Sequence, residues 1–226
     1  TIEGGFPGSI YPVNMKKKEI LGLKAYPSLR DIGQPVDLAV ISTPIHTVPD
    51  IMEECADLGV GGAVIISAGG KEVGPEGQAI EARIADIAHA GKVRVIGPNC
   101  MGVITTATRL NASFAPTMPL PGRLAFVSQS GAVCTSVLDY ALKQKVGFSY
   151  FISIGSMLDV DYGDLIDYLG NDPNVSSILL YIEMVNNHRK FMSAARAVSR
   201  VKPIVVLKSG RSAAGAKAAQ SHTGSL

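Results

Sequence analysis

The amino-acid sequence predicts an α/β protein with two domains in tandem, each built on a parallel β-sheet. Short β-branched apolar runs alternate with stretches of helical period along most of the chain, and turns rich in Gly, Ser and Pro separate them. The pattern starts again after a stiff connector near the middle. A length of 226 residues suits one large or two small domains, and 46% hydrophobic against 18% charged residues argues against general disorder.

In the first half, three apolar runs are typical of buried strands and two amphipathic stretches are typical of helices. The expected strands are 36–42, 63–67 and 93–96, and the expected helices are about 48–58 and 75–90. Because continuous apolar strands alternate with helices, we expect a parallel sheet that is covered on both faces. Residues 1–8 and 11–14 look like the approach to a second strand, which places the first strand and its Gly-rich turn upstream of Thr1.

The connector is the segment 118–122, which reads Met-Pro-Leu-Pro-Gly and suits no regular element. We therefore predict a domain of residues 1–118 followed by a domain of residues 119–226. The expected strands of the second domain are 124–127, 150–154, 177–182 and 203–207, and its expected helices are about 132–145, 162–169 and 189–200. The Ala-rich segment 212–220 is expected to form a loop or a short helix. Since the chain starts at Thr1 in mid-pattern and stops at Leu226 within a polar motif, we expect a part of a longer protein.

Composition argues against several classes of function. The 21 Lys and Arg residues against 19 Asp and Glu give a net charge of +2, which predicts neither a nucleic-acid nor an anionic-membrane partner. No apolar run reaches the roughly 18 residues that a membrane span needs. Cys55, Cys100 and Cys134 are odd in number and lack a C-x-x-C spacing, which predicts reduced thiols in the cytoplasm and no zinc cluster. No His spacing supports a metal site.

Ligands of parallel sheets bind beyond the carboxyl ends of the strands, which here are turns rich in Gly, Ser and Pro. The turns concerned are 42–44, 67–70, 97–100, 128–131, 153–156, Glu183 and 209–226. The segment 128–131, Ser-Gln-Ser-Gly, follows a strand and opens a helix, so its N–H groups and the helix dipole suit an anion such as phosphate. A plain helix cap needs the same residues, so both interpretations stay open.

Individual side chains at these turns also leave two interpretations open. His222, between Ser, Thr and Gly, has the chemistry of a nucleophile, a general base or a metal ligand, and a solvated surface His fits the same pattern. Glu183 ends an apolar strand, where a carboxylate either orients a His or meets solvent. Cys100 follows Asn99 in a turn and is either reactive or packed. The Lys run 16–18 either contacts phosphates or forms a solvated face.

Seven motifs follow one another along nearly the whole chain in the order in which one enzyme family carries them. They are Ile-Tyr-Pro-Val-Asn at 10–14, Val-Ile-Ser-Thr-Pro at 40–44, Ile-Ile-Ser-Ala-Gly at 65–69, Ile-Gly-Pro-Asn-Cys at 96–100, Val-Ser-Gln-Ser-Gly at 127–131, Leu-Lys-Ser-Gly-Arg at 207–211 and Ser-His-Thr-Gly-Ser-Leu at 221–226. With them the sequence resembles the nucleoside-diphosphate-forming acyl-CoA synthetases, that is, the α-part of ADP-forming acetyl-CoA synthetase and, more distantly, the α-subunit of succinyl-CoA synthetase. Met15 departs from the family, whose members often have Pro there.

The resemblance implies a CoA-binding Rossmann-like domain followed by a flavodoxin-like ligase domain. It implies an acid–CoA ligase that interconverts acyl-CoA, ADP and phosphate with acid, CoA and ATP, through an acyl phosphate and a phosphorylated His. On this interpretation His222 carries the phosphoryl group and Glu183 orients it. The phosphate-binding residues that the family implies are Ser130, Gly131, Ala132, Ser153 and Gly155. The positions that it implies for CoA or acyl-CoA are Asn14, Lys16, Ser42, Pro44, Ser67, Ala68, Asn99 and Cys100.

The resemblance also implies partners. The family binds ADP or ATP with Mg on an ATP-grasp domain or subunit that this chain lacks, so we expect the chain alone to be inactive and the full protein to be an oligomer. One alternative is an acyl-CoA-sensing, ligase-like regulatory region of a protein lysine acetyltransferase. A second alternative, a dinucleotide-binding redox domain, is disfavoured because Gly59, Gly61 and Gly62 precede a strand instead of following one.

Overall fold

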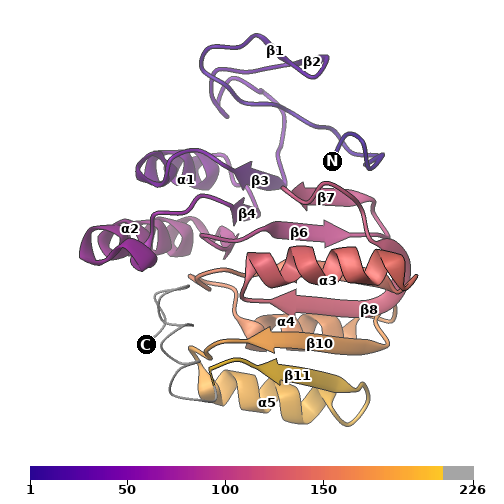
Figure 1. Cartoon of the computed structure of the whole chain (residues 1–226). Coiled ribbons are helices and arrows are strands. Elements are labelled where there is room, and N and C mark those ends of the chain that lie inside the picture. The colour runs from indigo at the N-terminus through magenta and orange to yellow at the C-terminus, as the bar shows by residue number, and fades with distance from the viewer. Residues whose placement is uncertain (211–226) are drawn as a thin grey trace.

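The computed structural model describes residues 1–210, which form two main β-sheets, five α-helices and a small N-terminal hairpin (Figure 1). Every strand and helix that the sequence predicts between residues 36 and 207 is present. The predictions for His222 and for the segment 212–220 lie outside the described residues. Within the part of the chain that is described, no helix is both long enough and apolar enough to cross a membrane.

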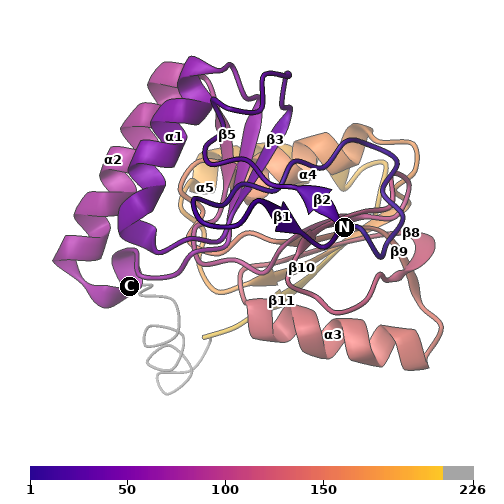
Figure 2. The same cartoon turned by 90° about the horizontal axis from the view of Figure 1, so that it is seen from above.

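The first sheet is parallel, with the strand order β3-β4-β5. Its strands are β3 (Leu38–Ile41), β4 (Gly62–Ile65) and β5 (Arg94–Ile96), which are joined through η1 (Ile45–Thr47), α1 (Val48–Asp57), η2 (Lys71–Val73) and α2 (Pro75–Gly91). Right-handed crossovers that step in one direction put both helices on the same face. Accordingly, α1 and α2 lie side by side on one face of this sheet (Figure 2).

The two faces of the first sheet differ in burial. On the helix side Met52 and Cys55 of α1 and Ile65 of β4 are fully buried in one apolar cluster. Leu38 and Val40 on the other face of β3 are 36% and 46% exposed. Elsewhere this second face is covered, since Val64 of β4 is 2% exposed and Ile96 of β5 packs against the apolar cluster that contains α4. The expectation of a sheet covered on both faces therefore fails only at the edge strand β3.

The second sheet has six strands in the order β11-β10-β8-β9-β6-β7. Its strands are β6 (Gly102–Thr105), β7 (Leu110–Ser113), β8 (Leu120–Ser128), β9 (Gly147–Ser153), β10 (Ser177–Ile182) and β11 (Ile204–Lys208), and its helices are α3 (Gly131–Lys143), α4 (Tyr162–Asn171) and α5 (His188–Val198). α3 covers one face, and α4 and α5 cover the other (Figure 2). The chain steps from β8 to β9 in one direction and then back to β10 on the other side of β8. A ligand site is expected at this reversal of strand order.

The edge of the second sheet departs from the sequence-based expectation of a purely parallel sheet. β6 and β7 form an antiparallel hairpin, and β6 also pairs antiparallel with β9. Residues 102–113, which lie before the predicted domain boundary, therefore belong to the second sheet. The boundary between residues 118 and 119 stays a prediction.

The structure of the connector 118–122 also differs from the prediction. β8 already begins at Leu120, so the prediction that residues 118–122 contain no regular element is wrong for 120–122. The register against β9 shifts between Pro121 and Leu124. A bulge of this kind tolerates a proline, which has no N–H to donate to the ladder.

The N-terminal segment forms a short hairpin instead of a second long strand. β1 (Glu19–Ile20) pairs antiparallel with β2 (Leu23–Lys24). Residues 11–14 contribute a single parallel bridge, between Val13 and Tyr26. The strand-like pattern at 11–14 thus corresponds to one bridge in the structure.

Apolar clusters attach the helices to both faces of the second sheet. Phe151 lies with its ring centroid 5.0 Å from that of Phe126 and 5.2 Å from that of Phe148, in the cluster beneath α3. On the other face Ile166 and Leu169 of α4 are fully buried. Large buried side chains on both faces hold the strands in register, and with them the turns at the strand ends.

α4 begins with a capping box. Asp161 Oδ1 accepts hydrogen bonds from Gly163 N at 2.7 Å and Asp164 N at 3.1 Å, and Asp164 Oδ2 accepts one from Asp161 N at 3.0 Å. Amides that have no acceptor inside the helix are thereby satisfied. Lys190 of α5 adds an ion pair with Asp161 Oδ1 at 3.2 Å.

We expect the Asp161→Ala substitution to lower the free energy of unfolding by about 1–2 kcal/mol, because it removes the cap. Asp161→Asn should cost less than half of that, because Asn retains an acceptor oxygen. Urea denaturation of the two variants measures the difference. Equal losses would show that the ion pair with Lys190, and not the cap, provides the stabilisation.

Candidate active site

Turns that are distant in the sequence meet at the carboxyl ends of the strands, beside the reversal of strand order. Three hydrogen bonds join them: Ile154 N to Ser128 O (2.9 Å), Met101 N to Ser153 Oγ (3.0 Å) and Glu183 N to Gln129 Oε1 (3.1 Å). The structure therefore brings the turns after β5, β8, β9 and β10 to a single edge, as expected for a sheet with parallel strands.

α3 starts at this edge and presents amide groups to it. Ser130 is the N-cap, and its Oγ accepts a hydrogen bond from Val133 N at 3.4 Å. Ser128 Oγ donates to Ser130 O at 2.9 Å and accepts from Ser130 N at 3.1 Å, which fixes the loop before the helix. The amides of Gly131 and Ala132 come first in the helix, where no intrahelical acceptor exists. Together with the helix dipole they suit an anion.

The candidate phosphate residues differ in exposure. Ala132 is exposed and Gly131 is partly exposed, whereas Ser130 is 3% exposed and Ser153 is completely buried. The hydroxyl of Ser153 accepts the hydrogen bond from Met101 N and so holds the segment that precedes β6. The amides at the start of α3 are therefore better placed to face a phosphate than the buried hydroxyl of Ser153.

Gly155 lies directly against the turn that follows β5. It has a φ of +53°, and a Cβ at this position would lie 2.2 Å from Pro98 O and 2.4 Å from Asn99 O. Ser156 N donates to Pro98 O at 2.9 Å. Only glycine allows both this backbone conformation and this close approach.

Glu183 provides a buried carboxylate at the same edge. The residue is 7% exposed, and its Oε2 is buried without a hydrogen-bond partner among residues 1–210. Its backbone is held on two sides, since Gln129 Oε1 accepts from Glu183 N and Lys208 Nζ donates to Glu183 O at 2.7 Å. A buried carboxylate oxygen without a partner is costly. This atom therefore marks a place where a hydrogen-bond donor would be stabilising.

Tyr162 is a buried residue whose hydroxyl feels the charge of this carboxylate. It is 1% exposed, and its hydroxyl donates a hydrogen bond to Tyr181 O. Burial, and next the negative charge of Glu183, raise the pKa of Tyr162 well above its usual range. The hydroxyl therefore stays protonated at neutral pH and acts as a structural donor.

Cys100 and Cys134 are packed inside the protein. They are 4% and 0% exposed, and Cys100 Sγ donates to Ile65 O at 3.2 Å. Burial raises the pKa of each thiol to about 12. Because the thiolate is the nucleophilic form, neither thiol is reactive at neutral pH. All three cysteines are free and buried.

The CoA candidates that follow β3 and β4 lie together. Ser67 Oγ donates to Thr43 O at 2.5 Å, and Asn99 N donates to Ser67 O at 2.9 Å. The exposed candidates of this group are Ser42, Pro44 and Ala68. Hydrogen bonds therefore join the turns after β3, β4 and β5 to one another.

Asn14 and Lys16 lie in a separate turn. Asn14 Oδ1 accepts hydrogen bonds from Lys16 N at 2.9 Å and Lys17 N at 3.0 Å, while Asn14 N donates to Tyr26 O at 2.8 Å. Lys16 is exposed. No hydrogen bond between described residues joins this turn to the cluster formed by the turns after β3 and β4.

Three residues of this region were not predicted from the sequence. Lys71 Nζ donates to Ser156 O at 2.8 Å and thereby links the segment after β4 to the turn after β9. Gln129 and Lys208 hold the backbone of Glu183. The sequence contained a signal for the last two, since Gln129 lies in the motif 127–131 and Lys208 in the motif 207–211, but their side-chain partners are distant in the sequence.

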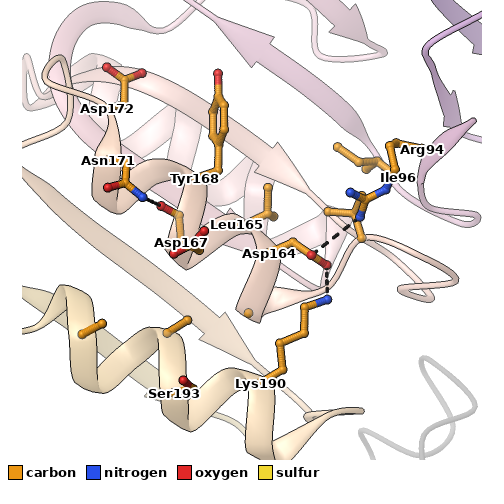
Figure 3. A pocket seen from close by; sticks show the side chains of 14 residues that line it. Arg94, Ile96, Asp164, Leu165, Asp167, Tyr168, Asn171, Asp172, Lys190 and Ser193 are labelled. Carbon is orange, nitrogen blue, oxygen red and sulfur yellow. Dashed lines mark hydrogen bonds and ion pairs between the residues drawn. The ribbon is translucent and has the colours of Figure 1, made fainter. Parts of the chain in front are cut away.

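A groove of about 960 Å³ lies elsewhere, between α4 and α5 (Figure 3). Asp164 lies there between Lys190 Nζ at 2.5 Å and Arg94 Nη2 at 3.6 Å, and Arg94 of β5 also pairs with Asp159 at 2.8 Å. Burial acts to raise the pKa of Asp164, but the hydrogen bond from Lys190 and the neighbouring positive charges bring it below its usual value. None of the site residues predicted from the sequence within residues 1–210 lines this groove. Its ion pairs join the first sheet to α4.

Two protein-family models match the chain. Residues 6–106 match the family model of a CoA binding domain, and residues 121–226 match that of the succinyl-CoA ligase like flavodoxin domain. The chain is 47% identical to acetate–CoA ligase [ADP-forming] I of Archaeoglobus fulgidus, over 98% of the chain and 32% of that protein. It is 45% identical to the α-subunit of acetate–CoA ligase [ADP-forming] I of Pyrococcus furiosus, over 100% of the chain and 50% of that subunit.

A solved structure is similar along the whole chain. The dinucleotide forming acetyl-coenzyme A synthetase 1 of Ca. Korarchaeum cryptofilum, in complex with phosphate and ADP, has a TM-score of 0.94 and 41% identity. The match covers 100% of this chain and 48% of that one. The chain thus spans between about a third and a half of the length of these relatives.

We expect Gly155→Ala to lower the free energy of unfolding by at least about 2 kcal/mol, from the left-handed φ and the clash with Pro98 O combined. Gly59 is the matched control, because it has a φ of +69° and a Cβ added there would meet open space out to 4 Å. Gly59→Ala should cost about 1 kcal/mol, from the backbone conformation alone. Urea denaturation compares the two, and equal losses would contradict the close contact.

We expect the native thiols to react with Ellman's reagent at pH 8 at least about 100-fold more slowly than free cysteine, whose pKa is about 8.5. Burial raises the pKa of Cys55 to about 11, and the other two thiols are higher. In concentrated urea all three should react at the ordinary rate. Rapid labelling of Cys100 in the native protein would show that its turn is open.

Proposed function

Because the chain belongs to the nucleoside-diphosphate-forming acyl-CoA synthetase family, we propose that it is the CoA-binding and phosphohistidine-bearing part of an ADP-forming acid–CoA ligase. The full reaction converts acyl-CoA, phosphate and ADP into acid, CoA and ATP. The observation that carries the proposal is the buried Oε2 of Glu183, which has no hydrogen-bond partner among residues 1–210 and lies at the same strand-end edge as the start of α3. This arrangement supplies one acceptor for a hydrogen-bond donor and one site for an anion.

The relay has three balanced steps. Phosphate attacks the thioester carbonyl of acyl-CoA, which gives an acyl phosphate and releases CoA. An imidazole nitrogen of His222 then attacks the acyl phosphate at phosphorus, which releases the carboxylic acid. Finally the phosphohistidine passes its phosphoryl group to ADP and yields ATP. Imidazole suits this role because it is nucleophilic at neutral pH and its phosphoramidate is labile.

The residues at the edge have separate roles in this relay. The amides of Gly131 and Ala132 stabilise the negative charge on the transferring phosphoryl group without exchanging protons. Glu183 accepts a hydrogen bond from the imidazole N–H of His222 that is not phosphorylated, which orients the ring and makes it more basic. Ser153 and Gly155 shape the turn that closes the phosphate site from the side of β9.

Coenzyme A would lie along the turns after β3 and β4 and reach the edge past Asn99. Ser42, Pro44, Ser67 and Ala68 contribute to that surface, and Asn14 and Lys16 would contact the far end of the same ligand. Cys100 packs beneath the surface and does not act as a nucleophile.

The nucleotide half-reaction requires a second component. We propose that an ATP-grasp domain or subunit binds ADP with Mg and receives the phosphoryl group, and that the reaction takes place in the cytoplasm. Acetate is the first acid to test. The sensor region of a protein lysine acetyltransferase is not favoured, because the similar proteins described above are named as ligases or synthetases.

The test is phosphorylation of the full protein that contains this chain, with its ATP-grasp partner, from labelled phosphate and acetyl-CoA. We expect His222→Asn to abolish the labelled phosphoenzyme and Glu183→Gln to reduce its rate of formation at least about 10-fold. Asp139→Asn, which changes an exposed carboxylate of α3, is the control and should leave the rate unchanged. Persistent labelling of His222→Asn would sink the proposal.

A further inference from the structure

We propose that Gln129 is a positioning residue, which holds the carboxylate of Glu183 at a fixed place beside the anion site of α3. The inference rests on the proposed function, because it concerns how Glu183 is presented to the histidine. Gln129 itself does not need to touch a substrate.

The hydrogen bonds of Gln129 carry the argument. The residue is 2% exposed and lies in the loop between β8 and α3. Its side-chain Oε1 accepts hydrogen bonds from two consecutive amides, Glu183 N at 3.1 Å and Met184 N at 3.0 Å. Its backbone N donates to Tyr181 O at 3.2 Å. One residue of the helix-start loop therefore makes three hydrogen bonds to the end of β10 and the turn that follows it.

The other support of this turn comes from a different place. Lys208 Nζ, on the edge strand β11, donates to Glu183 O at 2.7 Å, and Ser209 N donates to Ile182 O at 2.9 Å. These bonds hold the turn from the side of β11 and make no bond to the loop before α3. Of the two supports, Gln129 is the one that couples the carboxylate to the helix-start amides.

The carboxylate depends on this support because its own Oε2 has no partner among residues 1–210. Its place is set by the backbone of Glu183, and that backbone is set in part by Gln129. A displacement of about 1 Å in a positioning group can cost a reaction about 100-fold. Loss of the Gln129 acceptor should therefore slow phosphoryl transfer to the histidine while it leaves CoA binding intact.

The experiment uses the full protein with its ATP-grasp partner, labelled phosphate and acetyl-CoA. Gln129→Met retains the approximate volume and removes the acceptor, and we expect phosphoenzyme formation to slow about 10- to 100-fold with KM for acetyl-CoA changed less than about twofold. If Gln129→Met does not fold, Gln129→Asn replaces it, since its amide is one methylene short of the two N–H groups.

Asp161→Ala is the matched control for a purely structural effect. Asp161 also offers one side-chain oxygen to two backbone amides, Gly163 N and Asp164 N, but at the start of α4. Assayed below the unfolding transition of both variants, Asp161→Ala should leave the rate within about twofold of the wild type. An equal loss of rate in both variants would overturn the inference.

A double-mutant cycle shows whether Gln129 acts through Glu183. In a Glu183→Gln background, Gln129→Met should slow phosphorylation by less than about threefold, because the group that it positions has been replaced. Independent, multiplicative losses would overturn the inference and leave the proposed function standing. If Glu183→Gln alone has no effect, the role of Glu183 in the proposed function fails and the inference fails with it.

Discussion

The contact between the turn after β5 and the turn after β9 is the constraint on which the arrangement of the two domains depends. It is made largely by backbone atoms: Ser156 N donates to Pro98 O, and Leu158 N donates to Gly97 O at 3.1 Å. The missing Cβ of Gly155 allows the two chains to come this close. Lys71 and the ion pair of Arg94 with Asp159 add side-chain links between the same two parts. The proposed surface for CoA and the proposed site for phosphate are thereby held in a fixed relation.

The electrostatics of the edge show how a nearly neutral chain could bind the highly charged ligands proposed for it. A net charge of +2 leaves no basic excess, and the proposed anion site consists of amides at the start of α3. The carboxylate of Glu183 would repel a free phosphate, so a carboxylate at this position is unfavourable for the binding of phosphate alone. The same position is favourable where an imidazole lies between the carboxylate and the phosphoryl group. The site therefore suits a phosphoryl group carried on histidine better than a phosphate bound alone.

Much of this architecture could be predicted because apolar periodicity and motif order are properties of the sequence itself. The helices and the central strands bury long apolar stretches, and the site turns follow them directly. The β6–β7 hairpin was missed because Gly102–Thr105 and Leu110–Ser113 are too short to carry a clear period. The strand over 120–122 was missed because a proline that lies at a bulge resembles a proline that breaks a strand.

The contacts at the candidate site that were not predicted from the sequence were missed for a different reason. The hydrogen bond from Glu183 N to Gln129 Oε1 joins residues 54 positions apart, and the bond from Lys71 to Ser156 joins residues 85 apart. No local pattern encodes either. The roles of the individual site residues remain predictions, since motif order gives their positions along the chain and not their contacts with a ligand.

The burial of Cys100 and Cys134 has a consequence for chemical selectivity. An exposed thiolate beside a thioester would accept the acyl group by exchange, and the protein would acylate itself. With pKa values of about 12, both thiols stay protonated and covered, so in the proposed reaction they would not compete with phosphate for the activated carbonyl. If acyl-CoA binds at this edge as proposed, the burial of both thiols would leave its acyl group to an oxygen nucleophile.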